Sequence, residues 1–319
     1  LSISDSMIHG KDNRIHVRDG SLELDDLQRE LKAELKGSYN DLPFLGSAVF
    51  AQQEDLFIIR DLLLSSGQSK IELEGEIGEH VNLAGAITTH DISFLSKILP
   101  YTTGARMRGG VDSTLEITGT FPELHFEGVM QAHDFSVADF LFNSGVAHWS
   151  YMDRELQVRD INGMGFGSPV KGEMTFTFPG GPLLAKMDLH GKDMAIEKWY
   201  IPLKWLTFAE GELEDVHVDL EGPLRELSGE IRFSSPHEVI LSGNRLMDVE
   251  ARVTVRNGRD ISFEGNTAWY EAKARGEGKI SIGKPASILD MNFETRDLDI
   301  SALKKDFPRL EDLGLQGTL

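Results

Sequence analysis

Hydrophobic and polar residues alternate strictly along much of the chain. In the stretch 70–77 the odd-numbered positions hold isoleucine, leucine or glycine, and the even-numbered positions hold lysine or glutamate. The same alternation recurs in 111–117, 216–221, 251–256 and 289–294. Because side chains of a β-strand point to opposite faces of the sheet in turn, each stretch predicts a strand with one apolar and one wet side.

Glycine occurs 32 times and falls mostly between these stretches. The pairs Gly109-Gly110, Gly180-Gly181 and Asn257-Gly258 predict hairpin turns, which need positive φ angles, and strands joined by hairpins form antiparallel sheet. Since the polar side of every strand is charged, no second layer is expected to cover it. The apolar sides must then meet one another or something else.

Short helices are predicted only before three prolines. The ranges 91–100, 196–201 and 300–307 carry apolar residues at helical spacing and end at Pro100, before Pro202 and before Pro308. Leucines at 24, 27, 31 and 35 also fit a helix, but the range 31–36 alternates apolar and charged residues. We therefore favour a strand there.

Three landmarks repeat at a spacing near one hundred residues. Arg-Asp followed by Ile or Leu places aspartates at 61, 160 and 260, and an aspartate before a short apolar segment ending in proline occurs at 91, 193 and 297. A glycine followed by proline and leucine occurs at 119 and 222. Coincidence among common dipeptides is the alternative explanation. Because the first three aspartates are periodic, we interpret them as turn or cap residues rather than a catalytic set.

These landmarks predict one continuous repeat domain over residues 1–319, with approximate units 1–90, 91–192 and 193–296 and a truncated unit 297–319. No apolar run reaches the ~18 residues that cross a bilayer, and the first ten residues do not resemble a signal peptide. We expect the chain to be a fragment of a longer protein, with targeting and anchoring segments elsewhere.

Charge and composition exclude several functions. Lys and Arg total 32 against 52 for Asp and Glu, a net charge of −20, so a nucleic-acid role lacks the basic surface it needs. Attraction to an anionic membrane surface is disfavoured for the same reason. With no cysteine, disulfides, thiolate nucleophiles and zinc–thiolate sites are excluded.

No motif indicates catalysis, a metal or a cofactor. The ten histidines include no helical pair at metalloprotease spacing, and Gly163-Met164-Gly165-Phe166-Gly167 lacks the spacing and lysine of a phosphate loop, so we interpret it as a turn or bulge. The four tryptophans could be carbohydrate platforms, but their apolar neighbours favour core or rim packing. The chain is therefore predicted not to be an enzyme.

The repeats, which cover nearly the whole chain, resemble those of a known family. Thr88-Thr89-His90-Asp91-Ile92-Ser93 leading to Leu99-Pro100, then the strand 109–119 and Pro122-Glu123-Leu124-His125-Phe126-Glu127-Gly128, is similar to the AsmA/TamB-like envelope proteins of the translocation and assembly module type. Later copies match less well. The resemblance implies an all-β fold: an elongated, repeat-built antiparallel sheet curled into an open groove, taco-like or solenoid-like, with short helices at repeat junctions.

The resemblance also implies a periplasmic body, an inner-membrane anchor and an outer-membrane partner of the Omp85 barrel class. The function we expect is a non-catalytic bridge that holds or conducts phospholipid or another acyl lipid between the two membranes. Alternatives are an assembly factor for outer-membrane proteins that offers sheet edges, or a closed β-solenoid acting as scaffold or adhesin. The predicted lipid-contacting residues are Ile71, Leu73, Ile77, Val111, Leu115, Ile117, Met174, Phe176, Met187, Leu189, Val216, Val218, Leu220, Ile231, Phe233, Val253, Val255, Leu289, Met291 and Phe293.

Overall fold

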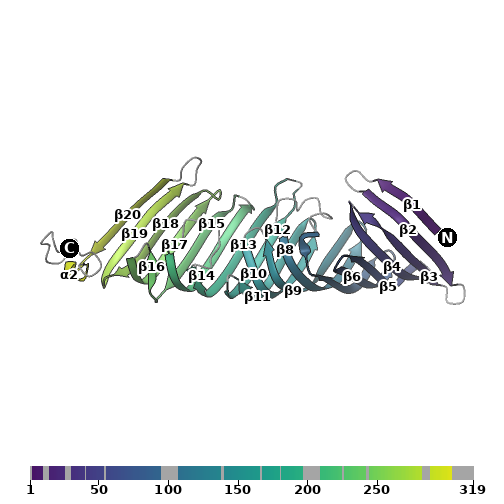
Figure 1. The fold of residues 1–319 in the computed structure, drawn as a ribbon, viewed down its shortest axis with the longest axis horizontal. Coiled ribbons are helices and arrows are strands. Elements are labelled where there is room, and N and C mark those ends of the chain that lie inside the picture. The colour runs from purple at the N-terminus through teal and green to yellow at the C-terminus, as the bar shows by residue number, and fades with distance from the viewer. Residues whose placement is uncertain are drawn as a thin grey trace. The chain divides into compact units, whose positions relative to one another are not determined.

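The computed structural model confirms an all-β antiparallel protein (Figure 1). It describes residues 2–9, 14–25, 30–39, 41–53, 55–94, 107–137, 140–165, 167–179, 181–196, 209–224, 226–241, 244–281 and 288–303. These residues form twenty strands, and every pairing given below is antiparallel. None of their helices is long or apolar enough to cross a membrane.

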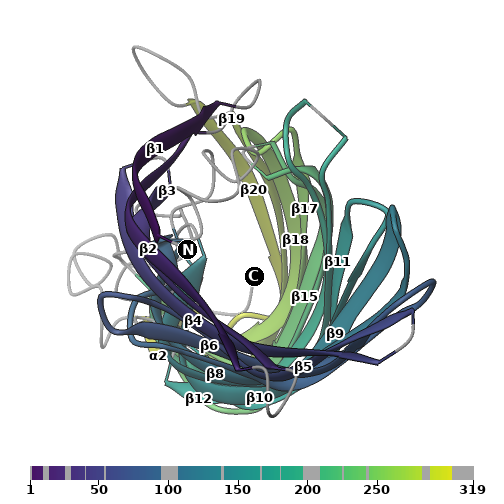
Figure 2. The same cartoon turned by 90° about the vertical axis from the view of Figure 1, so that its right-hand side faces the viewer.

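The chain divides into two compact units. Unit 1 comprises Leu1–Gly163 with Thr175–Leu183. Its strands pair in chain order from β1 to β10. The strands bend along their length, so their sheet is curved (Figure 2). Their bounds are β1 Ser2–His9, β2 Arg14–Asp25, β3 Glu30–Tyr39, β4 Leu42–Gln53, β5 Leu56–Ser66, β6 Ser69–Ile77, β7 Val81–Thr89, β8 Met107–Thr120, β9 Glu123–Val137, β10 Phe140–Met152 and β11 Glu155–Gly165.

Unit 2 comprises Met164–Met174 with Leu184–Leu319. From β13 to β20 the strands again pair in chain order, except that β15 and β16 share one place between β14 and β17. The break between them contains Pro236, which has no N–H to donate. The bounds are β12 Ser168–Thr177, β13 Leu184–Ala195, β14 Ala209–Pro223, β15 Ser228–Ser235, β16 Val239–Leu241, β17 Asn244–Arg256, β18 Asp260–Trp269, β19 Ala272–Ser281 and β20 Ile288–Arg296.

The predicted strands are present, and one of the turn predictions is corrected. Residues 30–39 form β3, so the strand predicted for the leucine-rich segment is confirmed. Asn257 and Gly258, with φ angles of 51° and 62°, make the predicted turn between β17 and β18. Gly109-Gly110 is not a turn: it lies inside β8 at a pairing irregularity, where Gly109 has φ 101°. Gly180 is outside the described residues.

Aspartates mark irregular positions inside several strands. Asp134, Asp160, Asp193 and Asp248 have φ angles of 47°, 54°, 50° and 51° within β9, β11, β13 and β17. Asp61 lies in β5 beside a shift in register. The interpretation of Asp61 and Asp160 as turn or cap residues is therefore wrong, because both lie inside strands. Of the two, Asp160 has the left-handed conformation, which aspartate tolerates. Asp260 begins β18 directly after a turn.

The positive φ angle of Asp193 provides a stability test. Asp193→Gly keeps easy access to positive φ and should change the free energy of unfolding by less than about 1 kcal/mol, whereas Asp193→Val should lower it by roughly 1–2 kcal/mol. Urea unfolding of both variants measures the difference. Equal losses would show that the side chain, and not the backbone conformation, matters at this position.

Two Asp-Ile-Ser sequences make the same local structure. Asp91 accepts hydrogen bonds from the backbone N–H of Ser93 (2.9 Å) and from its hydroxyl (2.8 Å). Asp299 accepts the equivalent pair from Ser301 at 2.8 and 2.6 Å. The hydroxyl bond, then the backbone bond, holds the pKa of the Asp299 carboxyl below its usual value.

At two of the three places where helices are predicted, the structure describes only a single turn. A 3₁₀ turn, η1, spans Ile92–Phe94, and one α-helical turn, α2, spans Ile300–Leu303. The rest of the predicted helical ranges, 95–100, 197–201 and 304–307, lies outside the described residues. In the described part each of the two elements is a single turn, and the fold depends on strand pairing.

Candidate apolar sheet face

The strand register places apolar side chains of successive strands side by side. In unit 1, Leu73 of β6 pairs with Gly85 of β7, which pairs with Leu115 of β8. The neighbouring positions Glu72, Ala86 and Thr114 form the adjacent row on the opposite side of the sheet. We call the side carrying Leu73 and Leu115 the apolar face of unit 1, and the side carrying Glu72 its polar face.

A hydrophobic cluster lies on the apolar face of unit 1. Its buried members are Ile59, Val81, Leu83, Leu115 and Ile117. Packed against it are the half-buried side chains of Phe50, Leu62, Ile71, Leu73, Ile77, Ile87, Leu124, Phe126 and Trp149. The cluster therefore extends over strands β4 to β10 of one sheet.

The side chain of Trp149, on β10, reaches across β9 to β8. A Cβ added to Gly128 of β9 would lie 3.0 Å from the indole nitrogen. The indole therefore lies over Gly128 only because this residue has no side chain. The indole N–H then donates to the hydroxyl of Ser113, 2.7 Å away on β8. This arrangement supports the packing role predicted for Trp149, since its polar atom is satisfied within the sheet.

Unit 2 carries a longer aligned row. Seven directly opposed positions run from β13 to β20: Leu189, Val218, Ile231, Val253, Phe263, Gly278 and Met291. With strands roughly 4.8 Å apart, six steps make an apolar row of about 29 Å. We call this side the apolar face of unit 2.

Glycines on β19 accommodate aromatic rings on this face. A Cβ added to Gly278 would lie 2.5 Å from the Phe263 ring, and one added to Gly276 would lie 3.5 Å from the Phe293 ring. Phe293 also meets Trp269 edge-on, with ring centroids 5.4 Å apart. Large rings thus lie over positions without side chains, and the face is covered by hydrocarbon and not by backbone.

The predicted lipid-contacting residues differ strongly in exposure. Buried are Val111, Leu115, Ile117, Met174, Phe176, Met187, Leu189, Val216, Val218, Leu220 and Ile231. Half-buried are Ile71, Leu73, Ile77, Phe233, Val253 and Val255. Met291 and Phe293 of β20 are exposed, at 58% and 40%, while the Leu289 side chain is outside the described set. The apolar faces are therefore packed in part by their own side chains and open in part to solvent.

Sequence reasoning missed exposed residues of the apolar face in unit 1. Leu24, Leu35, Phe57 and Leu64 are 64%, 36%, 53% and 38% exposed. Pairing places them on the same side as Leu73, through Phe57 with Ile77 and through Leu64 with Ile71. The alternation at 31–36 predicted the orientation of Leu35, but exposure depends on neighbouring strands that the pattern does not reveal.

The other tryptophan in the described part packs at the end of β18. Trp269 contacts Tyr270 at 5.3 Å between ring centroids and adjoins the buried cluster of Ala272, Leu298 and Leu303. Its indole nitrogen is buried and has no hydrogen-bond partner there. The packing prediction is supported for Trp149 and Trp269, whereas Trp199 and Trp205 lie outside the described residues.

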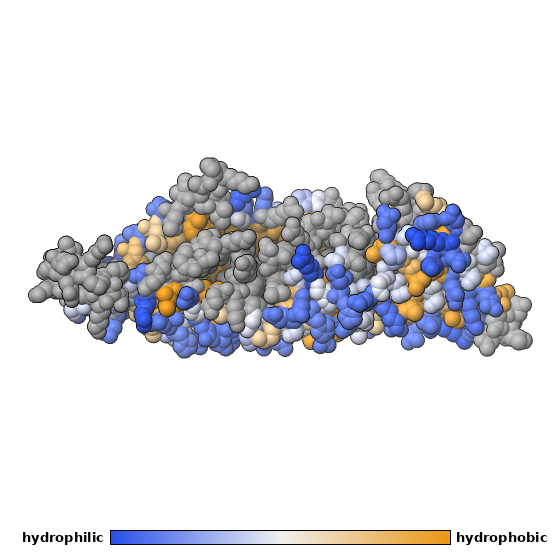
Figure 3. Space-filling view, viewed as in Figure 1, coloured by the Kyte–Doolittle hydropathy of each residue, from blue (hydrophilic) through white to orange (hydrophobic). Residues whose placement is uncertain are grey.

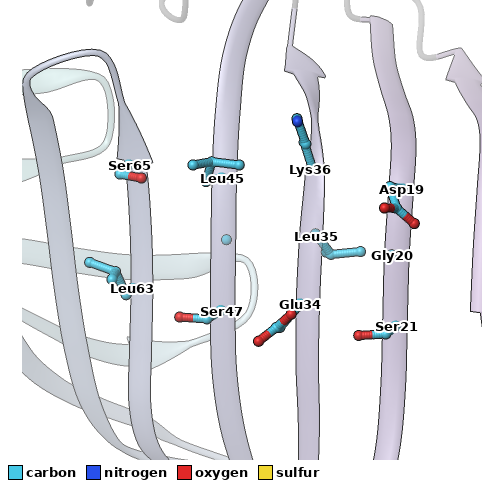
Figure 4. A pocket seen from close by; sticks show the side chains of 11 residues that line it. Asp19, Gly20, Ser21, Glu34, Leu35, Lys36, Leu45, Ser47, Leu63 and Ser65 are labelled. Atoms are coloured by element: carbon cyan, nitrogen blue, oxygen red, sulfur yellow. The ribbon is translucent and has the colours of Figure 1, made fainter.

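A depression in unit 1 lies on the polar face and not on the apolar one. Its volume is about 420 Å³, and Figure 4 shows side chains of neighbouring strands around it. The lining includes Asp19, Ser21, Glu34, Lys36, Ser47 and Ser65, together with Leu45 and Leu63. Alternation puts these residues on the side of Glu72, since Leu63 pairs with Glu72. Charged, hydroxyl and leucine side chains line the depression together, so its lining is mixed, unlike that of the apolar faces.

The polar face of unit 2 carries a chain of ion pairs. Glu230 contacts Arg232 (2.9 Å) and Arg252 (3.3 Å), and Glu264 contacts Arg252 (3.9 Å) and Arg275 (3.8 Å). Such exposed pairs each contribute at most about 1 kcal/mol. Figure 3 shows hydrophilic residues over much of the coloured surface, with smaller hydrophobic patches between them. The ion pairs satisfy the charges of a face that stays in water.

The glycine-rich segment and the histidines are the remaining candidates that the sequence raised. Gly163 and Gly165 lie in β11 and Gly167 has φ 79°, so this segment is the end of a strand and a turn, as predicted. The register also brings His190 of β13 directly opposite His217 of β14, beside Asp188. Spacing along the chain did not reveal this group.

Comparison with known proteins identifies no relative. No protein-family model, no curated protein and no solved structure matches the chain.

Proposed function

We propose that the chain is a non-catalytic envelope protein that holds or conducts acyl lipid along the apolar faces of its two units. The row in unit 2 from Leu189 to Met291 carries the proposal. It combines hydrocarbon at aligned positions over about 29 Å with an exposed end at β20. Both are needed if an acyl chain is to enter and lie along the sheet.

An acyl chain is expected to lie on an apolar face because exposing hydrocarbon to water costs free energy. An acyl chain of ~16 carbons in water costs about 13 kcal/mol, at ~0.8 kcal/mol per CH₂. Each CH₂ that lies on an apolar face recovers part of this cost, while the headgroup stays at the charged margin. A continuous face makes the free energy of the chain nearly constant along its length, which permits movement as well as holding.

The burial pattern supports a division of the apolar faces into a packed floor and a contact surface. Met187 and Val216, each 1% exposed, are packed by protein and form the floor under the lipid. Acyl chains contact the half-buried and exposed members, such as Phe57, Leu64 and Met291. The bent strands of unit 1 are compatible with a groove, since a groove needs a curved sheet (Figure 2).

The proposed setting is the periplasm of a bacterium with two membranes. There the full-length protein is anchored in the inner membrane and meets an Omp85-type outer-membrane protein, as in the AsmA/TamB-like family. The exposed Phe57 and Leu64, on a strand that is paired on both sides, favour lipid over a closed scaffold, since a sealed solenoid would bury such side chains.

Phe57→Asp tests lipid holding against a matched control. Phe57 and Leu45 are similarly exposed, at 53% and 55%, but lie on opposite faces of unit 1. Phe57→Asp should lower the bound phospholipid seen in native mass spectra by at least about threefold, since a carboxylate beside hydrocarbon is costly. Leu45→Asp should leave it unchanged. Absence of co-purified phospholipid from the unmodified chain, or equal effects of both variants, would refute the proposal.

A further inference from the structure

A group of three metal-binding side chains lies on the polar face of unit 2. Asp188 and His190 are two residues apart on β13 and project to the same side, while His217 on β14 is paired directly with His190. Side chains at i and i+2 of one strand and at the opposed position of its neighbour converge on one spot. The fold therefore brings His217, from another strand, to the pair of Asp188 and His190.

The ligand atoms are spaced as a metal ion requires. The Oδ1 atom of Asp188 lies 2.9 Å from Nε2 of His217 and 3.3 Å from Nε2 of His190, and the ligand atoms of all three residues lie within 4.8 Å of one another. Ligands at about 2.0–2.1 Å from a tetrahedral zinc ion are roughly 3.3 Å apart. We propose that Asp188, His190 and His217 bind one divalent transition-metal ion of the zinc class.

The ligand types define the class of ion. Two imidazoles and one carboxylate suit Zn²⁺, Co²⁺, Ni²⁺ or Cu²⁺, and they are a poor set for Ca²⁺ or Mg²⁺, which prefer oxygen. Three protein ligands leave at least one coordination position for water or for a group from another molecule. The three side chains are 44%, 55% and 22% exposed, so an ion reaches them from solvent.

One rearrangement accompanies binding. The two imidazole rings are stacked, with centroids 4.1 Å apart and planes 10° from parallel. Because a nitrogen lone pair lies in the plane of its ring, stacked rings cannot aim both Nε2 atoms at one ion. His190 is the more exposed of the two, so its ring is free to turn toward the position between Asp188 and His217.

In the present arrangement Arg232 disfavours metal binding by His217. Its Nη2 lies 3.0 Å from Nδ1 of His217, and since a guanidinium only donates, Nδ1 accepts and the ring proton sits on Nε2, facing Asp188. A metal at Nε2 needs that proton to move to Nδ1 and Arg232 to withdraw. Glu230, 2.9 Å from Nε of Arg232, is placed to hold the withdrawn guanidinium.

Cobalt titration of the purified chain tests the site. Co²⁺ should bind with one equivalent and give the visible absorption of a low-symmetry nitrogen-and-oxygen site, and Zn²⁺ should displace it. His190→Ala or His217→Ala should weaken binding at least about tenfold, the loss already seen when outer-shell partners of metal ligands are removed. Arg232→Met should strengthen it several-fold.

His148→Ala is the matched control, since His148 pairs with Asp160 at 3.0 Å without a second imidazole; it should leave the affinity unchanged. Far-UV circular dichroism shows whether each variant folds, and His190→Gln replaces any alanine variant that does not. The proposal is overturned if the unmodified chain binds no Co²⁺ at millimolar concentration, or if His190 and His217 variants bind as tightly as the control.

Discussion

Gly85→Ala is expected to lower the free energy of unfolding by about 3 kcal/mol, a large effect for a single methyl group. Gly85 lies on the apolar face between Leu73 and Leu115. A Cβ there would lie 1.8 Å from the carbonyl oxygen of Glu72 and 3.0 Å from Cα of Leu73. Both atoms belong to the backbone of β6, so the clash is relieved only by separating two paired strands.

The control for this variant is Gly181→Ala. Gly181 has no atom within 4 Å of an added Cβ and no positive φ, so the change should be within about 0.5 kcal/mol of neutral. Urea unfolding followed by circular dichroism gives both values as shifts of the midpoint. If Gly85→Ala unfolded at the same urea concentration as Gly181→Ala, the claim that β7 packs closely against β6 at Gly85 would be wrong.

Arg60→Met is expected to lower the free energy of unfolding by roughly 2 kcal/mol. Arg60 forms an ion pair with Glu30, whose side chain is only 7% exposed. Removing the arginine leaves a carboxylate in a place where water reaches it poorly. The cost falls below the ~3–5 kcal/mol of a fully buried pair because Arg60 itself is 57% exposed.

A double variant separates this explanation from a loss of packing. Glu30→Leu combined with Arg60→Met removes both charges and should recover most of the stability lost in the single variant. Lys70→Met breaks the pair of Lys70 with Glu72, in which both side chains are half exposed, and should cost less than about 1 kcal/mol. If the double variant were as unstable as Arg60→Met, the lost stability would come from the packing of the arginine side chain and not from the unpaired carboxylate.

The strands and their two faces could be predicted from sequence because a period of two is local information. Alternation around Leu73 and Leu115 is visible in any short window and gives the side on which each residue lies. Irregular positions inside strands could not be predicted in this way. Aspartate and glycine are typical turn residues, so Asp160 and Gly109 indicate turns in the sequence. Strand pairing alone shows that both lie inside a continuous strand.

Exposure and the metal-binding group depend on register, which the sequence leaves open. Met187 and Met291 follow the same alternation, yet one is 1% and the other 58% exposed, because β13 lies among paired strands and β20 is followed by no described strand. His190 and His217 meet only through the pairing of β13 with β14. A shift of one residue would place His217 on the other face.

Site-specific photo-crosslinking tests the central proposal, that acyl lipid lies on the apolar faces. A photoreactive amino acid at Phe57, Leu64 or Met291 should yield protein–phospholipid adducts in cells, whereas the same amino acid at Glu72 or Glu116, on the polar face of unit 1, should yield none above background. Adducts at all five positions in equal amounts, or at none, would contradict the account.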